Sequence, residues 1–104
     1  MGKNRTIKSL GKVIGNIVVH KITLKYGDKP ESSDHTFSEI IAYRDNAIGI
    51  AQEFNWNNSD KIRIKQEALK EFTRKMKIKY PDIKFPIEEA NKIIIETIKE
   101  CLFL

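Results

Sequence analysis

Apolar residues recur at intervals of three and four positions along three stretches of the chain, which is the spacing of an amphipathic α-helix. These stretches are residues 36–54, 61–79 and 87–102. The turn-forming sequence "NWNNSDK" separates the first two, and "YPDIKFP", with two prolines that end or start helices, separates the last two. Three amphipathic helices joined by short connectors predict an all-α fold.

The first 26 residues fit two structures. Read as a helix, seven apolar residues between 7 and 22 share one face. Read as a strand, residues 17–26 alternate in side-chain character and are rich in the branched residues that strands favour. A single strand has no sheet to join in this chain, whereas a fourth helix completes a bundle. We therefore predict a compact four-helix bundle-like single domain over residues 1–104, with an α+β fold in which 17–26 is a strand as the alternative.

The periodicity also predicts which side of each helix is buried. For helix 36–54, capped by Asp34 or Thr36, the predicted buried residues are Phe37, Ile40, Ile41, Ala47, Ile48, Ala51 and Phe54. For helix 61–79, capped by Asn58 or Ser59, they are Ile62, Ala68, Leu69, Phe72 and Met76. Four aromatic residues that flank the turns are expected to form one cluster over the loops or, alternatively, a patch for a partner: Phe54, Trp56, Tyr80 and Phe85.

Helix 87–102 carries an apolar face too wide for one neighbouring helix, because Ile93 and Ile95 lie beside its main stripe. The apolar tail Phe103 and Leu104 extends this surface. Arg44 lies within the apolar arc of helix 36–54 and needs an acidic partner on another helix or on a second subunit. These residues predict a small, non-enzymatic interaction module that self-associates or binds a small protein partner.

Charge points to an alternative function. The chain has a net charge of +5, and residues 61–84 are strongly basic. Four cations share a narrow arc of helix 61–79, and basic residues near the N-terminus add to them, so the alternative is a nucleic-acid backbone-binding protein. The predicted binding residues are Arg63, Lys70, Arg74, Lys77, Lys8 and Lys12, helped by Lys3 and Arg5. The competing interpretation is a solvated face, partly neutralised by Glu67 and Glu71.

No motif in the chain predicts catalysis or cofactor binding. His20, His35 and Cys101 lack the spacing of metal ligands, and no glycine-rich phosphate loop is present. We therefore expect no enzyme activity, no cofactor, no metal and no small-molecule substrate. Cys101, the single cysteine, is expected to be a buried free thiol in a reducing compartment. Charged residues interrupt every apolar run before it reaches the length of a membrane span, so we expect a cytoplasmic protein with no membrane segment.

Overall fold

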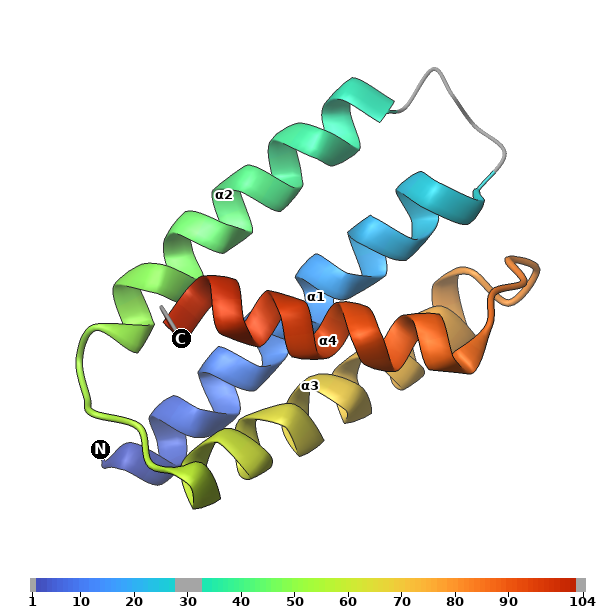
Figure 1. Cartoon of the computed structure of the whole chain (residues 1–104). Helices are drawn as coiled ribbons and strands as arrows, with labels where there is room; N and C mark the ends of the chain where they lie inside the picture. Colours follow the sequence, from blue (N-terminus) through green and yellow to red (C-terminus); the bar gives the residue numbers. More distant parts are fainter. Residues whose placement is uncertain (1, 28–32, 103–104) are drawn as a thin grey trace.

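A computed structural model describes residues 2–27 and 33–102 and folds them into four α-helices (Figure 1). These are α1 (Lys3–Tyr26), α2 (Ser33–Ala51), α3 (Asn58–Lys79) and α4 (Ile87–Leu102). The predicted all-α, four-helix bundle-like fold is confirmed. The alternative with a strand at residues 17–26 is wrong, because these residues continue α1 to its end.

The helix α1 lies between α2 and α3, and α4 lies obliquely across the layer that these three helices form (Figure 1). This central position explains why α1 supplies much of the hydrophobic core. Its buried apolar residues are Ile7, Leu10, Ile14, Ile17, Val18, Val19 and Ile22. Two hydrogen bonds from the Lys21 ammonium, each 2.9 Å long, reach Thr97 Oγ1 and Glu100 Oε1 and fix α4 against α1.

The start of α3 is set by a reciprocal pair of hydrogen bonds. The Asp60 amide donates to Asn57 Oδ1 at 2.8 Å, and the Asn57 amide donates to Asp60 Oδ2 at 3.1 Å. This capping box satisfies two amides that have no partner within the helix. It begins α3 at Asn58, three residues before the predicted start, and makes Asn57 the cap in place of Asn58 or Ser59.

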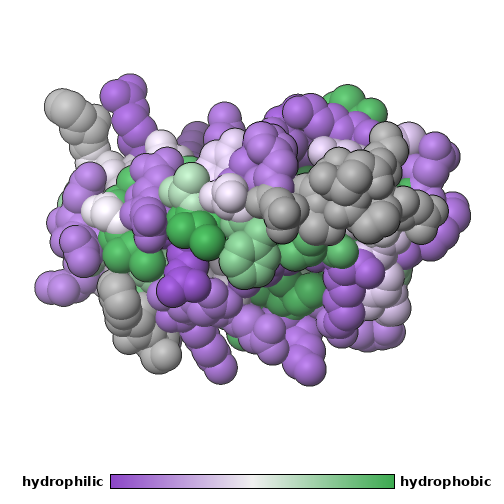
Figure 2. All heavy atoms as spheres, turned by 90° about the horizontal axis from the view of Figure 1, so that it is seen from above, coloured by the Kyte–Doolittle hydropathy of each residue, from purple (hydrophilic) through white to green (hydrophobic). Residues whose placement is uncertain are grey.

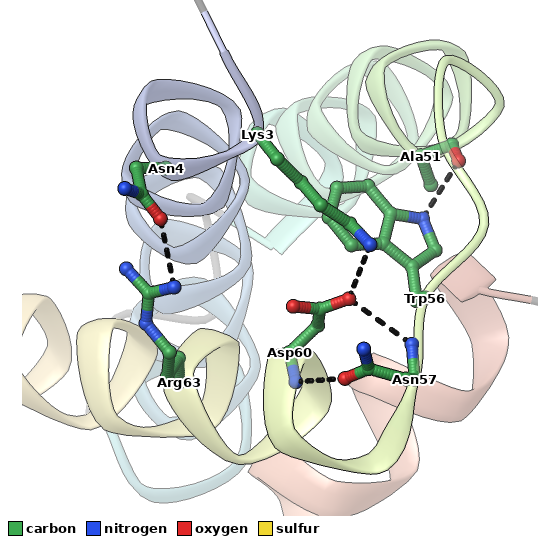
Figure 3. A network of polar contacts seen from close by, with 7 residues as sticks. All are labelled: Lys3, Asn4, Ala51, Trp56, Asn57, Asp60 and Arg63. Atoms are coloured by element: carbon green, nitrogen blue, oxygen red, sulfur yellow. Dashed lines mark hydrogen bonds and ion pairs between the residues drawn. The ribbon is translucent and has the colours of Figure 1, made fainter.

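A polar network joins the end of α2 to the starts of α1 and α3 (Figure 3). The Lys3 ammonium lies 2.5 Å from Asp60 Oδ2 and 5.6 Å from the centroid of the Trp56 ring. Trp56 in turn donates its indole N–H to the Ala51 carbonyl at 2.8 Å, where α2 ends. The hydrogen bond from Lys3, together with that from the Asn57 amide, holds the pKa of Asp60 below its ordinary value.

The lowered pKa of Asp60 predicts a loss of stability in acid. A carboxyl group with a depressed pKa in the folded state stabilises the fold above its unfolded pKa of about 3.9. That stability is lost as the pH falls through the folded-state pKa. We expect the Tm difference between the wild type and Asp60→Asn to be constant near pH 7 and to shrink below about pH 4. Thermal melts between pH 7 and 2.5 measure this difference, and a gap that does not change with pH would contradict the role of Lys3.

The buried side of α3 differs from the predicted one. Ile64 is fully buried, whereas Ile62 is 58% exposed and Leu69 is also exposed. The reason is that two acidic residues, Asp60 and Glu71, occupy part of the buried side that faces α1, which turns the helix away from the purely apolar stripe. In the same way, Phe37 and Ile41 of α2 are exposed although the periodicity predicted burial. The helix also ends at Ala51, so Phe54 lies outside it and is exposed.

The four aromatic residues around the turns do not form one cluster. Phe54 packs edge-on against Trp56, with ring centroids 5.7 Å apart, and Phe85 packs against Phe72 at 5.5 Å. Trp56 precedes α3 and Phe85 follows it. A helix of 22 residues is about 33 Å long, so turns at its two ends cannot meet.

Candidate nucleic-acid interface

Two glycines of α1 allow α3 to approach closely. A Cβ atom at Gly15 would lie 2.8 Å from the Ala68 carbonyl oxygen and 2.8 Å from Glu71 Cβ, and one at Gly11 would overlap with Glu67 Cβ. Near the helix starts, Arg63 donates a hydrogen bond of 2.8 Å to Asn4 Oδ1. Residues 4, 11 and 15 of α1 thus contact residues 63, 67 and 71 of α3 in the same order. The two helices are therefore parallel. We call this contact the glycine seam.

The basic residues of α1 and α3 point to the same side of the layer. Two side chains that are nine residues apart on a helix are separated by about 900° of rotation, or two and a half turns. They therefore point to opposite sides of the helix. Lys21 binds α4, so Lys12, nine residues earlier, points away from α4. Likewise Phe72 contacts Phe85 beside α4, so Arg63, nine residues earlier, points away from α4 as well.

Six exposed basic residues of α1 and α3 lie on this side of the layer, and we call them the cationic face. Its members are Lys8, Lys12, Arg63, Lys70, Arg74 and Lys77. The two basic segments predicted to act together are thus neighbours in the fold, because the glycine seam brings α1 and α3 together. The face lies on the side of the layer that α4 leaves open.

The two arginines of the cationic face have partners within the protein. Arg74 reaches both oxygens of Glu71, with Nε 3.3 Å from Oε1 and Nη2 2.9 Å from Oε2. Glu71 is buried beside the glycine seam, so this pair neutralises a carboxylate that α3 carries into its contact with α1. Arg63 is held by Asn4, a neutral partner that leaves its charge uncompensated. Both arginines thus have a structural role in the fold.

The four lysines of the cationic face differ from the arginines. Lys8, Lys12, Lys70 and Lys77 are exposed, and none has an ion-pair partner within residues 2–27 and 33–102. Lysine is a compact point charge on a flexible stem and binds phosphate electrostatically. Chemically, the arrangement offers two adjacent rows of ammonium groups for electrostatic attraction of an extended anion.

No protein-family model, curated protein or solved structure matches this chain. None of the helices within the described ranges combines the length and apolar character that crossing a membrane requires.

The residues predicted to form a protein interface differ in their exposure to solvent. Ile93 is buried in the core of the chain itself, whereas Ile95 on the same helix is 40% exposed. Phe103 and Leu104 lie outside the described residues. Arg44 is half exposed, and its Nη1 lies 3.8 Å from Glu100 Oε2 on α4, so an acidic residue of another helix is near it.

One polar cluster was missed by the sequence analysis. His20 of α1 and His35 of α2 both lie against Glu39, with Nε2 atoms 2.5 and 2.8 Å from the two carboxylate oxygens. The i,i+4 spacing of His35 and Glu39 is a local signal, but the approach of His20 depends on the antiparallel pairing of α1 and α2. Within the described part of the chain, no group of three or more His, Cys, Asp or Glu side chains is arranged so that it could hold a metal ion.

Cys101 is a buried free thiol in α4, as predicted. Burial raises the pKa of the Cys101 thiol to about 11. The thiolate is the reactive form of cysteine, and a raised pKa keeps the Cys101 thiol protonated at neutral pH. Cys101 is therefore an unreactive core side chain.

Proposed function

We propose that the protein binds the phosphate backbone of nucleic acids through its cationic face. The observation that carries this proposal is the joint position of two lysine pairs, Lys8 with Lys12 and Lys70 with Lys77, on one open side of α1 and α3. Lysine pairs from two distant segments lie side by side because the glycine seam holds α1 against α3 and the basic arcs of both helices point away from α4. A net charge of +5 supports attraction of a polyanion at neutral pH.

The chemistry of the face favours binding without sequence preference. Phosphate contacts position a protein on nucleic acid, whereas base contacts specify sequence. The arginine forks that suit guanine edges are engaged by Asn4 and Glu71. The neighbouring aromatic residues Trp56 and Phe72 have inward contacts of their own. Lysines that meet phosphates release condensed counterions, so binding should weaken steeply with salt.

Fluorescence anisotropy of a labelled DNA duplex across a salt series tests the proposal. Four phosphate contacts imply that log K falls against log salt with a slope of about −3.6. In a variant with Lys8, Lys12, Lys70 and Lys77 replaced by glutamine, we expect both the affinity and this slope to be largely lost. A labelled single strand, with a slope of about −0.7 per contact, distinguishes the preferred form of nucleic acid.

The matched control removes the same charge from the opposite side. Lys92 and Lys99 are exposed on α4, Lys84 precedes this helix, and Lys79 lies half a turn from Lys70. Replacing these four lysines by glutamine should leave most of the binding intact. Equal loss in both quadruple variants would show that net charge alone drives association, and absence of binding by the wild type at low salt would refute the proposal.

A second candidate function is a small protein-interaction module. Large apolar side chains are exposed on α4, including Ile87 and Ile95, and an exposed apolar patch marks a site of protein association when its residues are contiguous. Because Ile93 is already covered by the chain's own core, the interface predicted along α4 would use Ile95 and the C-terminal tail.

A further inference from the structure

A row of exposed apolar side chains runs along α2. Phe37 is 56% exposed, Ile41 is 48% exposed and Ile48 is partly exposed. With Arg44 they are spaced by four, three and four residues, which places all four on one side of the helix. In the view from above, hydrophobic residues appear as separate patches between hydrophilic ones across the middle of the molecule (Figure 2). We call these four residues the α2 ridge.

Small uncharged residues flank part of the α2 ridge. Ala42 and Gly49 are exposed beside it, and a Cβ atom at Gly49 would have no neighbour within 4 Å among the described residues. The acidic Glu39 is turned away, toward His20 and His35. Small side chains on a helix let a second helix approach closely, because the distance between two packed helices depends on the side chains at the contact.

Arg44, near the centre of the α2 ridge, is followed directly by the oppositely charged Asp45. Arg44 has only the 3.8 Å contact with Glu100 among ion pairs of the described residues. Asp45 is exposed and has no ion pair in the same part of the chain. Ile41 and Ile48 lie at equal distances in sequence on either side of this Arg-Asp pair.

We infer that the α2 ridge binds the α2 ridge of a second copy of this chain in an antiparallel, two-fold symmetric dimer. A two-fold axis between positions 44 and 45 places Arg44 beside Asp45 of the partner subunit, and the symmetry repeats this ion pair. The same axis places Ile41 against Ile48 of the partner subunit. One surface therefore provides both halves of a complementary contact, which favours a second copy over an unrelated partner.

Sedimentation velocity of the full chain over a series of concentrations tests the dimer. A contact along one helix is at the small end of stable interfaces, so dimers should form in roughly the micromolar range. We expect Ile41→Glu to remove the dimer and Ile62→Glu, a similarly exposed isoleucine on α3, to leave it intact. Circular dichroism melts of both variants show whether each remains folded.

Charge reversal tests the register of the proposed contact. Asp45→Lys places like charges together across the two-fold axis and should weaken the dimer at least tenfold. The double variant Arg44→Glu with Asp45→Lys restores opposite charges and should recover much of the lost affinity. A wild type that stays monomeric at every concentration would overturn the inference. So would a dimer that survives Ile41→Glu, is lost in Ile95→Glu, or gains nothing from the double reversal. The variants at positions 41, 44 and 45 lie on α2 and leave all six residues of the cationic face in place, so their effect on the dimer is measured separately from nucleic-acid binding.

Discussion

Replacing Gly15 by valine is expected to lower the free energy of unfolding by about 3 kcal/mol or more. Even the first added carbon would lie 2.8 Å from the Ala68 carbonyl oxygen, a backbone atom that moves only with the whole of α3. The two further methyl groups of valine would enter the same space, so α1 and α3 would have to separate. Urea denaturation followed by circular dichroism measures the change.

The matched control for the glycine seam is Gly49→Val on α2. It adds the same atoms to the interior of another helix, but nothing in the described part of the chain lies within 4 Å of the new Cβ. We expect a change within about 0.5 kcal/mol, since valine has a better helix propensity than glycine. If Gly15→Val were as well tolerated as Gly49→Val, the close packing of α1 on α3 would be wrong.

Shortening two isoleucines on α3 should give very different results. Ile64→Ala is expected to cost about 2–5 kcal/mol, because Ile64 is fully buried and its removal leaves a cavity. Ile62→Ala should change stability by less than about 0.5 kcal/mol, because this side chain is 58% exposed. Both variants replace isoleucine by alanine, and the two positions are only two residues apart. Each variant is therefore the control for the other.

Chemical denaturation of both variants decides between two orientations of α3. The apolar periodicity alone favours burial of Ile62, whereas the structure buries Ile64. A larger loss of stability in Ile62→Ala than in Ile64→Ala would restore the orientation expected from periodicity. It would also move the cationic face, whose direction depends on the same helical rotation.

Helix positions could be predicted from the sequence because periodicity and turn residues are local signals. The predicted ends of the helices were less accurate. Asn57 caps α3 only in combination with Asp60. At the end of α2, the Trp56 indole N–H donates a hydrogen bond to the Ala51 carbonyl. The rotations of α2 and α3 were predicted least well, whereas the apolar face predicted for α1 is buried. Buried carboxylates such as Glu71 are tolerated only because another residue neutralises them, and the single sequence does not show that Arg74 does so.

The candidate site depended on a contact that periodicity cannot show. The basic arcs of the two helices were visible in the sequence, but whether they face the same side depends on the direction and rotation of α1 relative to α3. Gly11 and Gly15 were the sequence signal for close packing, yet their partner helix was not specified. The α2 ridge was missed because exposed and buried isoleucines have the same periodicity on a helix with a wide apolar face.

The parallel contact of α1 with α3 also has a consequence for synthesis on the ribosome. Asn4 and Arg63 are 59 positions apart, so the glycine side of α1 has no partner until α3 has been made. The emerging chain can pair α1 with α2, but the core surfaces that α3 and α4 later cover stay open to water during that time. The buried apolar side of α1 is thus translated before the two helices, α3 and α4, that complete its cover.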